Sequence, residues 1–119
     1  MDYHSHVRNG MRHCWEVRRL WKYAESIPAK RVSVKALRTN LDGSCWFTTN
    51  PVLHDIVEHM RRVMRADLRY PIILSPDNLV MDGLHRLTKA ILRKNKYIWA
   101  VKLPRLPVPD EILPIKETS

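Results

Sequence analysis

The sequence has few of the residues that mark disulfide-rich, fibrous or membrane-spanning proteins. Its two cysteines, Cys14 and Cys45, are too few for a disulfide framework and lack the spacing of a metal-binding pair. No apolar run approaches the roughly 18 residues of a membrane span, and the first residues lack the apolar core of a signal peptide. Three glycines among 119 residues exclude a collagen-like chain. We therefore expect a cytoplasmic protein with two reduced thiols and no membrane contact.

The size and charge of the chain point to one small basic domain. A length of 119 residues fits a single domain, and an apolar content of 45% is that of an ordinary folded protein. Lysine and arginine number 21 against 12 acidic residues, which gives a formal net charge of +9. Such an excess favours an anionic partner, which is a nucleic acid, a nucleotide or an acidic protein.

The first half of the chain predicts a tail, a helix and a strand. Residues 1–13 are polar without periodicity, which predicts a flexible N-terminal tail. Apolar residues then recur at helical spacing, so we expect a helix over 14–26 that ends before Pro28. Apolar and polar residues alternate over 31–37, which predicts a half-buried strand. Residues 38–49 are expected to form a loop with a turn at Asp42-Gly43.

A second helix begins at Asn50-Pro51, where asparagine can cap the helix and proline suits its first turn. An apolar stripe continues to about Leu68. The opposite face of this helix carries arginines, and one further arginine follows the helix. This basic face is either a solvated face or a phosphate-binding surface. This second interpretation makes a DNA-binding module the alternative function, with the candidate residues Arg61, Arg62, Arg65 and Arg69.

The second half of the chain predicts a hairpin, a helix and a last strand. Residues 72–74 and 79–81 are short apolar runs separated by the turn residues 75–78. A helix is expected from about Leu84 to Lys94, with Asn95 in the left-handed position after it. A strand over 97–103 follows. Prolines then crowd residues 104–119, which predicts a C-terminal tail without long regular elements.

The segment Asp82-Gly83-Leu84-His85-Arg86 is the main candidate site, because a strand, a glycine and a helix start meet there. The first turn of a helix has free amide groups and the positive end of the helix dipole, so it binds phosphate readily. Arg86 can hold an anion, and His85 can donate a hydrogen bond or move a proton. Asp82 can cap the helix, orient a water or meet Mg²⁺.

Residues 31–103 resemble the ParB/sulfiredoxin fold. The resemblance rests on the order of a first strand, a helix leading into Tyr70-Pro71-Ile72-Ile73, a hairpin, a D-G-x-H-R helix start and a last strand. The resemblance implies an α+β fold in which helices flank a small mixed sheet. Here we expect this domain to span 14–103 and to have an extra N-terminal helix. Small stand-alone ParB-like proteins are similar to this chain over about 70 residues.

The chemistry of this superfamily can be compared at the motif. Sulfiredoxins carry a nucleophilic cysteine where this chain has Leu84, so sulfinic reductase activity is disfavoured. Partition proteins carry G-E-R-R against CTP phosphates, and here Gly83 and Arg86 match while His85 replaces the first arginine. Free-serine kinases of this fold have a similar motif and a catalytic glutamate that has no counterpart at Glu16 or Glu25.

The first hypothesis is a nucleotide- or phosphate-binding protein that hydrolyses ATP or another nucleoside triphosphate, or transfers its phosphate. Asp82 and His85 are its candidate catalytic residues and Mg²⁺ a candidate cofactor, and Trp46 is a candidate wall of the cleft. A non-catalytic interaction domain of the same fold is a further alternative, and we expect no dedicated metal site. The candidate phosphate-binding residues are Gly83, Leu84, His85, Arg86, Lys35 and Arg38.

Overall fold

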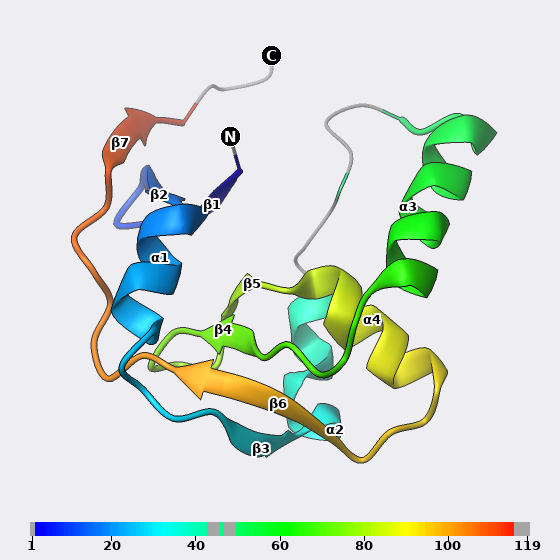
Figure 1. Ribbon diagram of the computed structural model, residues 1–119. Helices are drawn as coiled ribbons and strands as arrows, with labels where there is room; N and C mark the ends of the chain where they lie inside the picture. The colour runs from blue at the N-terminus through cyan, green and yellow to red at the C-terminus, as the bar shows by residue number, and fades with distance from the viewer. Residues whose placement is uncertain (1, 43–45, 47–49, 116–119) are drawn as a thin grey trace.

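The computed structural model describes residues 2–42, 46 and 50–115, which form a mixed α+β fold with two sheets (Figure 1). The first half contains the strands and helices β1 (Tyr3–Arg8), β2 (Met11–Glu16), α1 (Val17–Ala24), β3 (Lys30–Ser33), α2 (Val34–Leu37), a 3-10 helix η1 (Arg38–Leu41) and α3 (Leu53–Arg65). The second half contains β4 (Ile72–Leu74), β5 (Val80–Asp82), α4 (Leu84–Leu92), β6 (Tyr97–Lys102) and β7 (Glu111–Pro114).

The larger sheet carries the candidate site at one end. Its strand order is β3-β6-β4-β5, with β4 and β6 parallel and the other neighbours antiparallel. The elements predicted for this half of the chain are confirmed, namely the β4–β5 hairpin, the helix after Gly83 and the last strand. One detail is wrong: Lys94, with φ 57°, and not Asn95, takes the left-handed position after α4.

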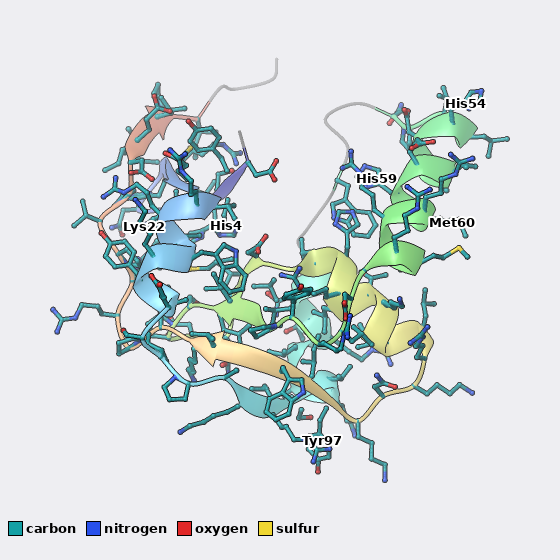
Figure 2. All side chains as sticks on the ribbon, in the orientation of Figure 1. His4, Lys22, His54, His59, Met60 and Tyr97 are labelled. Carbon is teal, nitrogen blue, oxygen red and sulfur yellow. The ribbon has the colours of Figure 1, made fainter. Side chains whose placement is uncertain are left out.

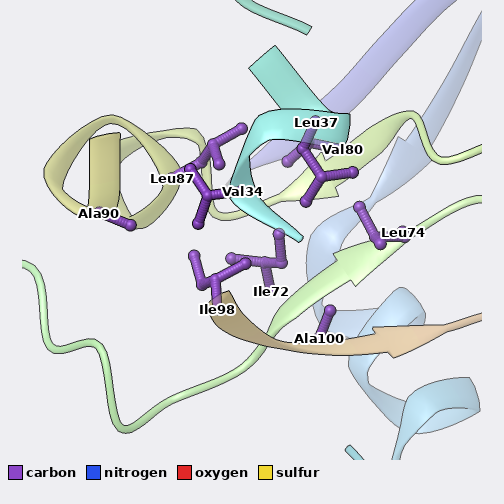
Figure 3. Packing of buried hydrophobic residues seen from close by; sticks show 9 residues of the cluster. All are labelled: Val34, Leu37, Ile72, Leu74, Val80, Leu87, Ala90, Ile98 and Ala100. Carbon is purple, nitrogen blue, oxygen red and sulfur yellow. The ribbon is translucent and has the colours of Figure 1, made fainter. Parts of the chain in front are cut away.

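Both faces of this sheet are packed against other elements. On one face, α2 and α4 cover the sheet through buried Val34, Leu37, Leu87 and Ala90 (Figure 3). On the other face, α1 and β2 cover Ile73, Met81 and Val101. On this second face, α1 and β2 do not cover Tyr97 and Trp99 of β6, whose side chains are 50% and 44% exposed.

The predicted flexible N-terminal tail is wrong, because residues 3–16 form a β-hairpin. Strands β1 and β2 pair antiparallel, and Asn9 and Gly10 both have positive φ in the turn between them. Asparagine followed by glycine is the residue pair that a two-residue hairpin turn favours. Strand β2, in which Cys14 is buried, ends at Glu16. The first helix therefore begins at Val17 and not at Cys14.

The proline-rich segment after β6 is not a free tail over the part that the structure describes. Strand β7 pairs antiparallel with β2 and completes the order β1-β2-β7. The Trp15 indole donates to the Pro107 carbonyl at 2.8 Å, and the Glu16 amide donates to the Asp110 carboxylate at 2.7 Å. These bonds fix the segment before β7 to β2.

The predicted strand over 31–37 is correct only as far as Ser33. The Ser33 hydroxyl accepts a hydrogen bond from the Ala36 amide, which caps the short helix α2. Val34 and Leu37 are then both buried one turn apart, which a strand would place on opposite faces. The second part of the alternating segment therefore forms a helix cap followed by one helical turn.

Helix α3 begins three residues after Asn50 and is attached to the body by its inner side. The Asp55 carboxylate accepts from the Val52 amide at its start, so the predicted Asn50 cap is not used. Of the predicted apolar stripe only Val63 is buried, whereas Met60 and Met64 are 57% and 72% exposed. Helix α3 projects away from the larger sheet (Figure 1).

Two further points concern the chain as a whole. Among the described residues, no helix has the length and hydropathy required to cross a bilayer. The predictions for Cys45 and for the turn at Gly43 concern residues outside those that the structure describes, as do residues 116–119 of the predicted tail.

Candidate functional site

The junction between β5 and α4 is built around Gly83. Its φ of +111° is one that side-chain-bearing residues rarely adopt, and a Cβ there would lie 2.4 Å from the Ile72 Cγ2 atom. Gly83 is the N-cap residue of α4 and has no side chain with which to cap the helix. The amides of the first turn of this nine-residue helix are therefore left for other partners.

The first turn of α4 opens into a cleft of about 760 Å³. One wall comes from the N-terminal hairpin, through Asp2, Tyr3 and His4, and the opposite wall comes from α3 and Trp46. The floor is the junction itself, from Val80 to Arg86. A volume of this size lies within the range of small-molecule binding sites.

A histidine pair under a tryptophan lies in this cleft. The His59 Nδ1 and His85 Nε2 atoms are 3.2 Å apart, and the two imidazoles are parallel to within 3°. The Trp46 indole stacks on both rings, with centroid distances of 4.9 Å to His59 and 4.4 Å to His85. Figure 2 shows His59 on the inner side of α3 and Met60 on its outer side. The pair thus joins α3 to α4 and fixes the orientation of His85.

The surroundings of His85 in the cleft favour its neutral form. Burial lowers the pKa of His85, and the neighbouring His59, Arg62 and Arg86 lower it further, against the opposing effect of Asp82. A neutral imidazole can accept a proton near neutral pH. Because Nε2 of His85 is bonded to His59, Nδ1 is its other ring nitrogen, and Nδ1 can accept a proton when Nε2 carries the ring hydrogen.

Arg86 and Asp82 are the basic and the acidic partner of an ion pair at the junction. Their side chains make an ion pair of 3.2 Å from the end of β5 to the first turn of α4, and both are less than a third exposed. The Asp82 carboxylate also accepts from the Trp21 indole at 2.9 Å. Asp82 therefore does not cap α4, as one prediction allowed, but positions Arg86. The Nε atom of Arg86 is buried and bonds none of the described residues.

Two of the arginines predicted for nucleic acid belong to the same cleft. Arg62 and Arg65 line it together with the motif residues. Lys89 holds this arrangement, because its Nζ donates to the Met64 and Ala66 carbonyls at 2.7 and 2.6 Å and so caps the end of α3 from α4.

The other predicted cations lie elsewhere. Arg61 pairs with Glu58 on the surface at 3.5 Å, and Arg69 makes several hydrogen bonds to Asp67, which lower the pKa of that carboxyl to about 2. Lys35 and Arg38 are exposed and are not among the described residues that line the cleft.

His59 is the functional candidate that the sequence reading missed. It lies one helical turn before Arg62 and two turns before Arg65, so the three side chains share one polar face of α3. This spacing was visible in the sequence. Its meaning was not, because only the contact with α4 shows that this face is turned inward.

No family model, curated protein or solved structure matches this chain. The candidate site is therefore described by its own geometry. Among the described residues, no group of three histidine, cysteine or acidic side chains is placed to hold a metal ion.

Proposed function

We propose that this chain is a nucleotide-binding protein of the ParB/sulfiredoxin-like type that holds the phosphates of ATP or another nucleoside triphosphate in the α4 cleft. The observation that carries the proposal is that Arg62 and Arg65 of α3 and Arg86 of α4 line the one cleft into which the first turn of α4 opens. Three guanidinium groups and free amides suit the several oxygens of a polyphosphate. Support for the fold type is the hairpin, Gly83, helix and strand order over 72–102.

The reaction that fits this arrangement is transfer of the terminal phosphoryl group to water or to a small acceptor. A bound water loses its proton to Nδ1 of His85 as its oxygen attacks the terminal phosphorus, and the bond from that phosphorus to the bridging oxygen breaks, which releases the nucleoside diphosphate. The His59 bond orients the imidazole, and the arginines stabilise the charge that develops on the phosphoryl oxygens. Asp82, which lines the cleft, would supply a carboxylate oxygen to a Mg²⁺ ion that arrives with the nucleotide.

Calorimetric titration with ATP, CTP and GTP, with and without Mg²⁺, tests binding. We expect at least one nucleotide to bind with a Kd below about 1 mM, which corresponds to roughly −4 kcal/mol. Arg62→Ala should weaken that binding about tenfold, because one charge-assisted bond is worth roughly 1.5 kcal/mol or more. Arg61→Ala is the matched control, since Arg61 is its neighbour on α3 but pairs with Glu58.

Catalysis is separated from binding by His85→Gln. Loss of a general base lowers turnover by about a hundredfold or more, so phosphate release should fall while the Kd changes little. If no nucleotide binds below millimolar, or if Arg61→Ala and Arg62→Ala behave alike, the proposal is wrong. Binding without turnover would instead favour the non-catalytic interaction domain.

Replacement of Asp82 by asparagine gives a further prediction. The carboxylate competes with ligand phosphates for Arg86, and one charge at this range is worth about 1 kcal/mol in a water-like medium. Asp82→Asn should therefore tighten metal-free nucleotide binding about fivefold, while the asparagine oxygen keeps the bond from Trp21. In Mg²⁺ the same variant should bind more weakly than the parent. Titration in EDTA and in Mg²⁺ measures both effects, and unchanged affinity in both would show that Asp82 faces no ligand.

A further inference from the structure

A second basic surface adjoins the cleft at Arg65 and extends over the part of the larger sheet that is left uncovered. Tyr97 and Trp99 project from β6 on the face that α1 covers only farther along the strand. Figure 2 shows Tyr97 on the outer side of β6, away from α4. Two large aromatic side chains that are about half exposed on one face of a sheet are unusual for a solvated surface and mark a place where a ligand can bind.

Cations surround these aromatic rings. Arg31 of β3 lies opposite Trp99 in the strand register, and its guanidinium sits 4.7 Å above the Tyr97 ring. A cavity of about 630 Å³ is bounded by Arg31, Lys96, Tyr97 and Trp99.

A second cavity of about 430 Å³ shares Leu68 and Trp99 with the first. Its lining adds Arg65, Arg69, Lys89 and Arg93.

The balance of charge along these two cavities is strongly one-sided. Asp67 is the single carboxylate among the described residues that line them, and it is already bonded to Arg69. Lys89 is engaged with the end of α3. The remaining cations border two cavities that meet at Trp99, an arrangement that suits a chain of phosphates whose bases are free to stack.

We propose that this uncovered half of the sheet, defined by Arg31, Arg93, Lys96, Tyr97 and Trp99, binds single-stranded nucleic acid, with a base stacked on Trp99 and the backbone along the cations. A duplex fits less well, because its bases are already stacked and cannot reach the indole. This surface differs from the one predicted from the arginines of α3, of which only Arg65 and Arg69 border it. It also does not depend on nucleotide binding in the cleft.

Fluorescence anisotropy with a labelled eight-residue oligothymidylate tests the proposal. We expect Trp99→Ala to weaken binding about tenfold, since stacking of one base contributes that much or more. Trp99→Phe should retain most of the affinity, because it keeps an aromatic face. Tyr23→Ala is the matched control, since Tyr23 is 47% exposed on α1 and lines neither cavity.

The charge contribution is measured by the dependence on salt. Each phosphate contact of a single strand contributes a slope of about −0.7 in a log–log plot, so Lys96→Ala should reduce the slope by about that amount, whereas Lys22→Ala on α1 should not. Oligouridylate in a parallel titration distinguishes RNA from DNA as the source of the strand. Unfolding midpoints of all variants confirm that each is folded.

Three outcomes would overturn the proposal. They are equal losses for Trp99→Ala and Tyr23→Ala, tighter binding of a duplex than of the single strand, and displacement of the strand by polyglutamate at equal charge. Arg86→Ala serves as the reciprocal variant, because it should weaken nucleotide binding in the cleft and leave the strand affinity unchanged. A failure of nucleotide binding alone would therefore leave this surface intact.

Discussion

Gly83→Ala is expected to lower the free energy of unfolding by about 2 to 5 kcal/mol. A positive φ costs a residue with a side chain about 1 to 2 kcal/mol, and the new methyl group would meet the Ile72 side chain at 2.4 Å. Ile72 is fully buried in the core and has little room to move, so overpacking adds about 1 to 3 kcal/mol. Small domains are stable by only about 5 to 15 kcal/mol.

Gly10→Ala is the matched control for this prediction. Gly10 also has a positive φ, of 74°, but an added Cβ there meets nothing within 4 Å. Its replacement should cost only the backbone contribution, about 1 kcal/mol. Urea denaturation followed by circular dichroism measures both variants, and equal losses would show that the contact with Ile72 relaxes. A larger loss at Gly83 would establish that the helix start of the site depends on this close approach.

The stability of the protein is expected to fall as the solution is acidified from about pH 7 to pH 4. Burial and the neighbouring His6 lower the pKa of His4 to about 4, against 6.5 in a free chain. The His4 and His6 rings are hydrogen-bonded at 2.9 Å, and both lie against Trp15. A histidine with a lowered pKa favours folding while it is neutral, so this contribution is complete above about pH 7.

The lowered pKa of His4 sets the size of this loss of stability and identifies a control variant. Below pH 6.5 the unfolded chain binds the proton more strongly, and stability decreases by at most about 1.4 kcal/mol per pH unit, or about 3 kcal/mol in total for His4. The loss levels off below about pH 4. His4→Gln should flatten this slope, whereas His54→Gln, on the exposed face of α3, should not. Thermal unfolding midpoints across this range measure it, and parallel curves for both variants would contradict the assignment to His4.

The elements of the second half were predictable because their signals are local. Proline, serine and asparagine mark the turn of the β4–β5 hairpin, and Gly83 separates a short apolar run from a helical pattern. The N-terminal hairpin was missed because its strands are polar and alternate weakly, so that only Asn9-Gly10 indicated a turn. Its second strand pairs with β7, about a hundred residues away in the sequence, and no local pattern reveals that pairing.

The candidate site was predictable in its floor and not in its walls. Strand, glycine and helix start placed Asp82 to Arg86 correctly at one junction. The approach of α3 depends on the His59–His85 bond and on Lys89, which are tertiary contacts between residues 23 to 26 positions apart. For the same reason the sequence separated Arg62 from Arg86, although the two border one cleft.

The place where the chain enters the fold has a practical consequence. Asp2, Tyr3 and His4 form one wall of the cleft, so any peptide joined ahead of Asp2 emerges at its rim. An affinity tag fused there would lie beside the mouth of the binding site, and a polyhistidine tag would bring imidazoles next to the ones that the site already contains. Ligand titrations on this protein should therefore be made after such a tag has been cleaved.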